Sequence, residues 1–427
     1  MANVALPNQF HIGIAGLDSS GRRLARALSE KRLTIVAYEC NADNIKTLQE
    51  EAPGISIHIT DSIDQFVGLL RPFRTIVVTG PDAGSSSCGD LLEQLEAEDL
   101  LIDAGNCYFK DCVRRARLLA ERNIRYMGMG IIGGKDPVVL ACGHHEVFQS
   151  TVPVLESMTS TQNGESSVSY LGSAVAAGHF IKMIHDGIEY SLAQLSQETS
   201  DLLKRALVMD DDELHEVTKA WQMIAPGSVR ADAARWTSQT AHELGTPTPT
   251  IDAAVGMRTL SELEKQNDFA TTLFRQPLGH FSDDREGILD ELQGALHVAT
   301  IITYAEAIAV LATGSDRYGF DFDVPEVIRL SKGCGGMRGA LLDEMATAVQ
   351  ATPHLPNLLY DDDLSEKVME QQERLRHAVW RACRLQTTVP ALMASLDYLD
   401  SDRGVWLPGN LIQASPTPSR LAGLGHR

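Results

Sequence analysis

Near its N-terminus the chain reads Phe10-His-Ile-Gly-Ile-Ala-Gly-Leu-Asp-Ser-Ser-Gly21, an apolar run that continues into a turn containing glycine. The run predicts a buried strand, and the segment from Gly21 to Glu30 predicts the helix after it. Gly16 allows the tight turn, and Gly21 allows the helix to pack closely on the strand. This pattern is typical of a dinucleotide-binding domain. Because two glycines at this spacing recur by chance, a domain of the same fold that has lost its nucleotide is the alternative.

An acidic residue, Glu39, stands at the end of the second predicted strand, 33–38. A carboxylate at this place accepts hydrogen bonds from the hydroxyls of an adenosine ribose, and it disfavours a 2′-phosphate. The sequence therefore predicts NAD as the cofactor, with NADP less likely. Asp18 does not fit the pattern, because its negative charge lies where the backbone approaches the pyrophosphate. The cofactor-binding residues predicted from this pattern are Gly16, Asp18, Gly21 and Glu39.

Farther along the chain, short apolar runs and helical segments alternate over residues 1–150, with further strands expected at 75–78 and 100–103. Such alternation predicts a parallel sheet with crossover helices. From about Gly178 helical spacing replaces the strand-like runs. We therefore expect a Rossmann-like α/β domain, then an all-α domain and an extended C-terminal tail. The predicted boundaries are 1–177 for the dinucleotide-binding domain, 178–405 for the helical substrate and dimerisation domain, and 406–427 for the tail.

The composition narrows the range of partners. The 427 residues include 37 basic and 57 acidic side chains, which gives a formal charge of −20. A chain this acidic repels nucleic acid and anionic membranes, so a phosphate ligand needs a local cationic pocket. The seven cysteines form no CxxC pair, which favours reduced thiols in the cytoplasm and predicts no metal site. We expect no signal peptide, and the apolar segment 295–312 predicts a buried helix because His297 and Glu306 interrupt it.

A second motif, Gly178-His-Phe-Ile-Lys-Met-Ile-His-Asp-Gly-Ile-Glu-Tyr190, carries most of the expected chemistry. On a helix Lys182, His185 and Glu189 share one face, while apolar residues cover the other sides. We expect this helix to be buried, with its polar stripe facing a cleft. A buried lysine can act as a base, and a nearby carboxyl can act as an acid. The alternative is a surface ion pair between Lys182 and Asp186 at i+4.

The second motif resembles the signature of the 6-phosphogluconate dehydrogenase family, and the resemblance extends over nearly the whole chain. It includes Ile102-Asp-Ala-Gly-Asn106, Gly130-Ile-Ile-Gly-Gly134, Arg235-Trp-Thr237, Ala254-Val-Gly-Met-Arg258 and Leu407-Pro-Gly-Asn-Leu-Ile-Gln-Ala414. A match at so many separated places is specific. The resemblance implies a homodimer that acts on a phosphorylated sugar acid.

Enzymes of that family oxidise the 3-hydroxyl of the sugar acid, lose CO₂ from the β-keto acid and protonate the enediol to a ketose phosphate. The resemblance implies that Lys182 takes the hydroxyl proton and later returns a proton to the carbonyl oxygen. Glu189 then corresponds to the acid that protonates the carbon left by CO₂. His185 and Asn106 match residues that hold the substrate, and we assign Asn106 to the cofactor site as well.

The resemblance also implies a site for the anionic end of the substrate. The predicted substrate contacts include Gly133, Gly134, Tyr190, Arg235, Thr237 and Arg258, with Arg235 in place of a lysine. In the family an arginine and a histidine near the C-terminus reach the site of the other subunit, and Arg420 and His426 show the same spacing. The tail is therefore expected to act across the homodimer. The alternative is a disordered tail.

Four further positions depart from the family pattern. Ile132 stands in place of a serine that helps to hold the substrate carboxylate, Lys135 in place of a glutamate, Asp186 in place of an asparagine, and Cys40 in place of the arginine that pairs with the 2′-phosphate of NADP. A carboxylate at position 186 favours the protonated lysine beside it. We expect an NAD-linked oxidoreductase that acts, with decarboxylation, on a phosphorylated or otherwise anionic sugar acid. The alternative is a non-catalytic paralogue that binds an anionic sugar phosphate.

Overall fold

The computed structural model describes residues 10–80, 86–133, 137–159, 167–223, 231–263, 284–332, 339–353 and 355–404. The chain forms two compact units that are interleaved along the sequence. The first unit draws on 1–190, 227–247 and 306–364, and the second draws on 191–226, 248–305 and 365–427. Helices α7 (Ala177–Leu207) and α12 (Arg285–Tyr318) contribute to both units. The domain boundaries expected from the sequence stay a prediction.

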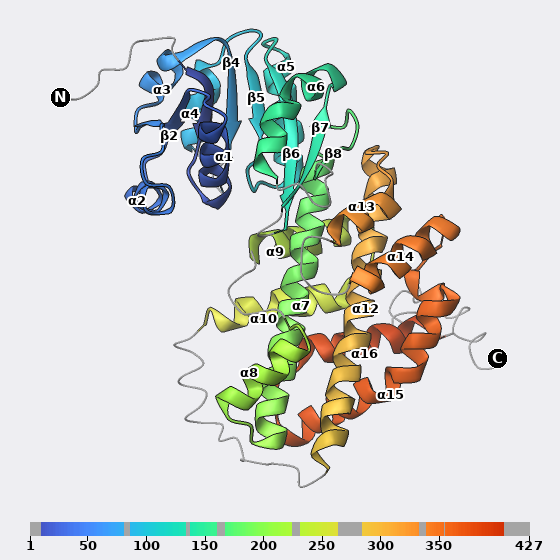
Figure 1. The fold of residues 1–427 in the computed structure, drawn as a ribbon. Helices are drawn as coiled ribbons and strands as arrows, with labels where there is room; N and C mark the ends of the chain where they lie inside the picture. Colours follow the sequence, from blue (N-terminus) through green and yellow to red (C-terminus); the bar gives the residue numbers. More distant parts are fainter. Residues whose placement is uncertain are drawn as a thin grey trace. The chain divides into compact units, whose positions relative to one another are not determined.

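The first unit contains an eight-stranded sheet in the order β3-β2-β1-β4-β5-β6-β7-β8 (Figure 1). The strands are β1 Phe10–Ala15, β2 Ile35–Tyr38, β3 His58–Thr60, β4 Leu70–Val78, β5 Leu100–Asp103, β6 Arg125–Ile132, β7 Val138–Gly143 and β8 Val168–Tyr170. The helices between them are α1 Ser19–Glu30, α2 Ala42–Glu51, α3 Ile63–Leu69, α4 Ser86–Gln94, α5 Phe109–Ala120 and α6 His145–Leu155. All neighbouring strands are parallel except β6 and β7. The expected Rossmann-like architecture is confirmed.

Strand β1 lies inside the sheet because its apolar side chains are buried between its neighbours. Ile12 and Ile14 are buried, and Ile14 aligns with Ala37 of β2 on one side and with Val77 of β4 on the other. Leu24 of α1 belongs to the same core cluster. The strand order changes direction between β1 and β4, and in such sheets ligands bind in the crevice at the carboxyl ends of these strands.

After β8 the described residues contain helices and no further strand, as the sequence predicts. Besides α7 and α12, these helices are α8 Asp211–Ala220, α9 Ala231–Leu244, α10 Pro249–Ser261, α13 Val324–Ser331, α14 Gly339–Ala351, α15 Asp362–Leu385 and α16 Pro390–Asp402. Helix α12 is long and apolar enough to cross a membrane, but 78% of its most apolar window is buried inside the protein. The expectation that segment 295–312 forms a buried helix is confirmed.

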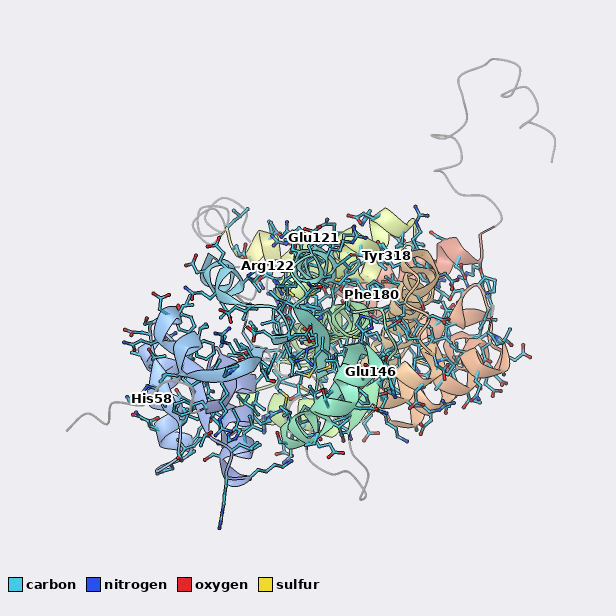
Figure 2. All side chains as sticks on the ribbon, turned by 90° about the horizontal axis from the view of Figure 1, so that it is seen from above. His58, Glu121, Arg122, Glu146, Phe180 and Tyr318 are labelled. Atoms are coloured by element: carbon cyan, nitrogen blue, oxygen red, sulfur yellow. The ribbon has the colours of Figure 1, made fainter. Side chains whose placement is uncertain are left out.

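The first part of α7 is anchored in the first unit by an aromatic cluster. The ring centroid of Phe180 lies 5.1 Å from that of Phe109 and 6.0 Å from that of Tyr318. Figure 2 labels Phe180 and Tyr318, which lie close to each other in that view. Phe180 is fully buried, and an added Cβ on Gly314 of α12 would lie 2.2 Å from its Cζ atom. Packing this close fixes the rotation of α7 about its axis, so its polar face keeps one direction.

In the second unit, the far part of α7 supports the start of α16. Glu198 accepts hydrogen bonds from Ala391 N at 2.9 Å and from Leu392 N at 3.0 Å. These are backbone groups of the first turn of α16, which have no partner within their own helix. Thr250 of α10 and Ser395 of α16 share a buried hydrogen bond of 3.0 Å. The Glu198 side chain therefore caps α16 from a neighbouring helix.

Candidate active site

The loop between β1 and α1 has the backbone geometry that its glycines predict. Gly16 has a φ of 103°, in the region that favours glycine, and its carbonyl oxygen accepts a hydrogen bond from Thr79 Oγ1 at 2.8 Å. A Cβ on Gly21 would lie 2.1 Å from this carbonyl oxygen, so the first turn of α1 lies directly on the loop. The loop, the N-terminus of α1 and the carboxyl end of β1 together fit the pyrophosphate of a dinucleotide.

Two carboxylates border this loop. Glu39 accepts hydrogen bonds from Leu17 N and from Asn41 N, both at 2.8 Å. It therefore joins the end of β2 to the glycine loop and places a negative charge beside it. Asp18 is the N-cap of α1 and accepts from Gly21 N at 2.9 Å. Its charge thus lies at the end of the helix that favours anions.

The predicted catalytic residues lie on the part of α7 that belongs to the first unit. Lys182 Nζ donates to Asp186 Oδ2 at 2.8 Å, and the two side chains are 15% and 11% exposed. His185 Nδ1 lies 3.7 Å from Asp186 Oδ1, and His185 Nε2 lies 4.0 Å from Glu189 Oε1. Lys182, His185 and Glu189 therefore lie close together, and Asp186 lies beside both Lys182 and His185. The i+4 ion pair is present, but it is largely buried and does not lie on the surface.

Burial and neighbouring charges set the protonation of the two carboxyl groups on this face. Burial alone raises the pKa of Asp186, but the charges of Lys182 and His185 outweigh it, and the pKa lies below its ordinary value. Burial raises the pKa of Glu189, and the opposing effect of His185 is smaller. Asp186 is therefore the ionised partner, whereas Glu189 keeps its proton to a higher pH than an exposed glutamate. A carboxyl group with a raised pKa close to a basic group suits general acid–base chemistry.

Helix α9 packs on this part of α7 through Thr237. Thr237 is fully buried, and its Oγ1 donates to the carbonyl oxygen of Met183 at 2.8 Å. Tyr108 OH and Thr240 Oγ1 lie 3.1 Å apart and connect α9 to the segment after β5. In this arrangement the Thr237 hydroxyl serves helix packing. Its role as a phosphate ligand stays a prediction.

The predicted arginines belong to different units. Arg235 of α9 lies in the first unit, is exposed, and is 3.5 Å from Asp232. Arg258 of α10 lies in the second unit and donates from Nε to Glu262 at 2.9 Å. Arg235 therefore pairs with a carboxylate of its own helix, and Arg258 pairs with the residue that caps the C-terminus of α10. Gly134, Arg420 and His426 fall outside the described residues, as does the C-terminal tail from residue 405.

The other predicted substrate positions lie at the ends of strands or on α7. Asn106 N donates to the carbonyl oxygen of Gly80 at 3.0 Å, in the loops that follow β5 and β4. Gly133 has a φ of 84° and follows β6, whose last residue, Ile132, is buried. Tyr190 is half-buried on α7 next to Glu189. The substrate roles of these residues stay predictions.

Sequence reasoning missed a buried polar cluster near the end of β5. Its members are Asp103, Cys107, Cys112, Arg115, Tyr126 and His179. They come from β5, the turn after it, α5, β6 and α7. No spacing in the sequence marks them, because only the fold brings these elements together.

The fold and the site together define a class of protein. A parallel sheet with a glycine loop where the strand order changes direction, followed by a long helix with a buried lysine, is typical of a dehydrogenase that uses a nicotinamide dinucleotide. Residues 11–172 match the NAD binding domain of 6-phosphogluconate dehydrogenase, and residues 178–228 and 228–416 match the C-terminal domain of the same enzyme. The chain belongs to the 6-phosphogluconate dehydrogenase family.

The similarity covers almost the full length of the chain. The NADP(+)-dependent, decarboxylating 6-phosphogluconate dehydrogenase of Bacillus subtilis is 31% identical over 440 residues, with 94% of each chain covered. The decarboxylating 6-phosphogluconate dehydrogenase of Synechocystis is 30% identical over 453 residues, which covers 96% of this chain and 94% of the relative. The structure of Plasmodium falciparum 6-phosphogluconate dehydrogenase matches 94% of both chains with a TM-score of 0.79 at 24% identity. The expected family is therefore confirmed.

Proposed function

We propose that this protein is an NAD-linked, decarboxylating dehydrogenase of a phosphorylated sugar acid of the 6-phosphogluconate class. The observation that carries the proposal is the buried face of α7, where Lys182 contacts Asp186 and Glu189 has a raised pKa. A protein that only bound a sugar phosphate would have no use for a buried lysine and a carboxyl group of raised pKa on one face. The decarboxylating enzymes of Bacillus subtilis and Synechocystis, similar over nearly the whole length, also favour an enzyme over a non-catalytic binder.

The residues of α7 supply the proton transfers of this reaction. The glycine loop would hold the dinucleotide, whose nicotinamide would supply the hydride acceptor for the carbon that carries the 3-hydroxyl. Neutral Lys182 accepts the hydroxyl proton, and the alcohol becomes a ketone. The protonated lysine then donates to the ketone oxygen while the bond to the carboxylate breaks, which gives CO₂ and an enediol. Glu189 donates its proton to the carbon that lost CO₂, and Lys182 takes the enediol proton as the ketose forms.

The preference for NAD is the finer part of the proposal. The Glu39 carboxylate lies beside the glycine loop, where it accepts from Leu17 N at 2.8 Å, and Cys40 follows it where a cation would be needed for a 2′-phosphate. The Glu39 carboxylate repels the 2′-phosphate of NADP, and Cys40 offers this phosphate no positive charge. NAD should therefore bind more tightly than NADP by about 1–3 kcal/mol. This preference differs from the NADP(+) dependence of the Bacillus subtilis relative.

The substrate is held by its phosphate and differs from 6-phosphogluconate near its carboxylate. Tyr190, Arg235, Thr237 and Arg258 are the proposed phosphate contacts, together with Arg420 and His426 supplied across a homodimer. At the other end Ile132 has no hydroxyl with which to hold a carboxylate. The protein is proposed to act in the cytoplasm.

The test is a turnover assay of the purified protein with NAD and with NADP against a panel of phosphorylated aldonic acids. NADH and CO₂ should form in equal amounts with at least one of these acids. Lys182→Met should abolish both products, and Glu189→Gln should slow turnover by about 10²–10⁴-fold. Lys204→Met is the matched control, because this exposed lysine of the same helix pairs with Asp211 and should be dispensable.

Calorimetric titration with both cofactors separates the parts of the proposal. Tighter binding of NADP than of NAD would reject the cofactor choice and leave the reaction intact. Binding of a sugar phosphate without turnover, with either cofactor, would favour the non-catalytic paralogue. Near-normal turnover in Lys182→Met would exclude this lysine as the base.

A further inference from the structure

The first unit contains a buried cluster of side chains that can ligate a metal ion. Asp103 ends β5, Cys107 lies in the turn that follows, Cys112 lies in α5 and His179 lies in the first turn of α7. One ligand atom from each of these four residues lies within 4.8 Å of every other. All four are buried. None of them is assigned to the substrate or to the cofactor.

His179 supplies an independent reason to expect a ligand. Its side chain is 2% exposed, yet neither ring nitrogen has a hydrogen-bond partner among the described residues. Its Nε2 atom lies 3.5 Å from Asp103 Oδ1. A buried nitrogen that gives up water without a replacement is unfavourable. A metal ion between the imidazole and the carboxylate would bind a ring nitrogen of neutral His179 in place of its ion pair with Asp103.

The two thiols approach each other closely. Cys107 Sγ and Cys112 Sγ lie 3.0 Å apart. Two thiolates on one tetrahedral zinc ion stand about 3.7 Å apart, because each Zn–S bond is about 2.3 Å long. Binding therefore needs an outward movement of the sulfur atoms of less than about 1 Å in total.

The surroundings of Asp103 orient it and balance the charge. Its Oδ2 atom accepts from Tyr126 OH at 2.7 Å and from Arg115. Its Oδ1 atom accepts from Gly105 N at 3.2 Å and faces His179, so this is the oxygen that can bind an ion. Hydrogen bonds on the other oxygen hold a ligating carboxylate in place. Two thiolates, one carboxylate and a divalent ion sum to one negative charge, which the Arg115 guanidinium neutralises.

We propose that Asp103, Cys107, Cys112 and His179 form a structural zinc site. Thiolate and imidazole ligands suit zinc, whereas magnesium and calcium take oxygen ligands. Four protein ligands leave no open coordination position, so the ion has a structural role and ties β5, α5 and α7 together. The sequence predicts no metal site because a CxxC pair is missing, but the fold brings a different set of ligands together. This proposal does not depend on the reaction proposed above.

The first experiment measures the metal content of the full-length protein, purified without chelator from cells grown with zinc. One zinc ion per chain should remain after gel filtration. Cys112→Ser and His179→Ala should lose it. Cys142→Ser is the matched control, because Cys142 is also a fully buried free cysteine but lies outside the cluster. Zinc that is retained in both ligand variants, or lost equally in the control, would overturn the proposal.

The second experiment needs only the wild-type protein, so it does not depend on whether the variants fold. Removal of zinc with a chelator should lower the midpoint of thermal unfolding, and one equivalent of zinc should restore it. Cobalt(II) in place of zinc should give the intense visible absorption of tetrahedral thiolate ligation. A wild-type protein that holds no zinc and gives no such spectrum on reconstitution would refute the site. So would a Cys107–Cys112 disulfide, detected by mass spectrometry in the native metal-free protein.

Discussion

The side chain of Asp186 controls the charge around the proposed base. Its Oδ2 atom accepts from Lys182 Nζ at 2.8 Å, and both side chains are largely buried. Charges in such surroundings are screened less by salt and water than charges on a surface. After burial, the charge of the Asp186 carboxylate is one of the causes that raise the pKa of Glu189. The resemblance to the family implies an asparagine at this position, so Asp186 adds a carboxylate to the proposed catalytic face.

The replacement Asp186→Asn should move the basic limb of the pH profile of kcat to lower pH. The reason is that burial raises the pKa of Glu189 and the Asp186 charge adds to the rise, so Glu189 loses its proton at lower pH once this charge is gone. Steady-state rates over a pH series measure the shift. Asp201→Asn is the control, since it removes an exposed partner of Arg205 on the same helix and should leave the limb in place. An unchanged limb in Asp186→Asn would mean that the charge of Asp186 does not act on Glu189.

The contact between helices α7 and α9 depends on Gly187. An added Cβ on Gly187 would lie 2.7 Å from Thr237 Oγ1 and 3.0 Å from Thr237 Cβ. Thr237 is fully buried, so it has no free space into which to move. We therefore expect Gly187→Ala to destabilise the protein by about 1–3 kcal/mol, seen as a lower midpoint of thermal unfolding.

A second glycine provides the control for this contact. An added Cβ on Gly256 of α10 meets nothing within 4 Å. Gly256→Ala should therefore stabilise the protein by about 0.5–1 kcal/mol, because alanine loses less backbone entropy in a helix. A loss of stability at Gly256 as large as that at Gly187 would show that the close contact is not the cause.

The start of α16 depends on pH through Glu198. Burial raises the pKa of Glu198 to about 6, and the hydrogen bonds from Gln194, Ala391 N and Leu392 N oppose the rise only in part. In an unfolded chain a glutamate titrates near about 4.3. Because the folded pKa is the higher one, the contribution of Glu198 to stability is fully present below the unfolded pKa. It is lost as the pH rises through the folded pKa, by about 2 kcal/mol in total.

Two substitutions separate the charge of Glu198 from its hydrogen bonds. Glu198→Gln keeps an acceptor but cannot ionise, so its stability relative to the wild type should increase by about 2 kcal/mol between pH 4 and pH 7. Glu198→Ala loses the acceptor and should be less stable than Glu198→Gln by about 1 kcal/mol at every pH. Urea unfolding at a series of pH values gives these differences. A constant difference between wild type and Glu198→Gln would contradict the raised pKa.

The elements predicted from the sequence are those with a strong periodic signal. Strand β1, the glycine loop and α1 are found where the pattern places them, and so is the long helix α7. Strands β3 and β8 have three residues each, too few for an alternation to be recognised. Strand β7 is antiparallel to β6, a pairing that a short connection allows, whereas a parallel pair needs a long crossover. The direction of β7 can therefore be predicted from the length of the connection, but not from the apolar residues of the two strands alone.

The candidate site follows the same rule. Lys182, His185 and Glu189 lie on one helix, so the helical repeat is enough to predict that they share a face. Asp103 and His179 are separated by three strands and two helices along the chain. The order of the strands in the sheet brings these two residues close together, and this order cannot be predicted from a local sequence pattern. The buried cluster near β5 therefore becomes visible only in the folded protein.

The formal charge of the whole chain, −20, opposes the binding of an anionic substrate. The two described arginines proposed for the phosphate each lie beside a nearby carboxylate, Asp232 for Arg235 and Glu262 for Arg258. Part of their positive charge is thereby neutralised. A further arginine and a histidine from a second subunit would then contribute much of the net attraction.

Removal of the residues after Ala414 should therefore weaken substrate binding and abolish most of the turnover, without unfolding the protein. Mixing the truncated protein with full-length Lys182→Met tests whether the tail acts across the dimer. Each parent lacks turnover, but a mixed dimer holds one complete site, with the lysine from the truncated chain and the tail from the other. Random subunit exchange gives about half mixed dimers, so about a quarter of the wild-type activity should return. The control mixes truncated protein with truncated Lys182→Met, which should stay inactive. Recovery in neither mixture, with subunit exchange verified by native mass spectrometry, would mean that the tail does not complete the site of a second subunit.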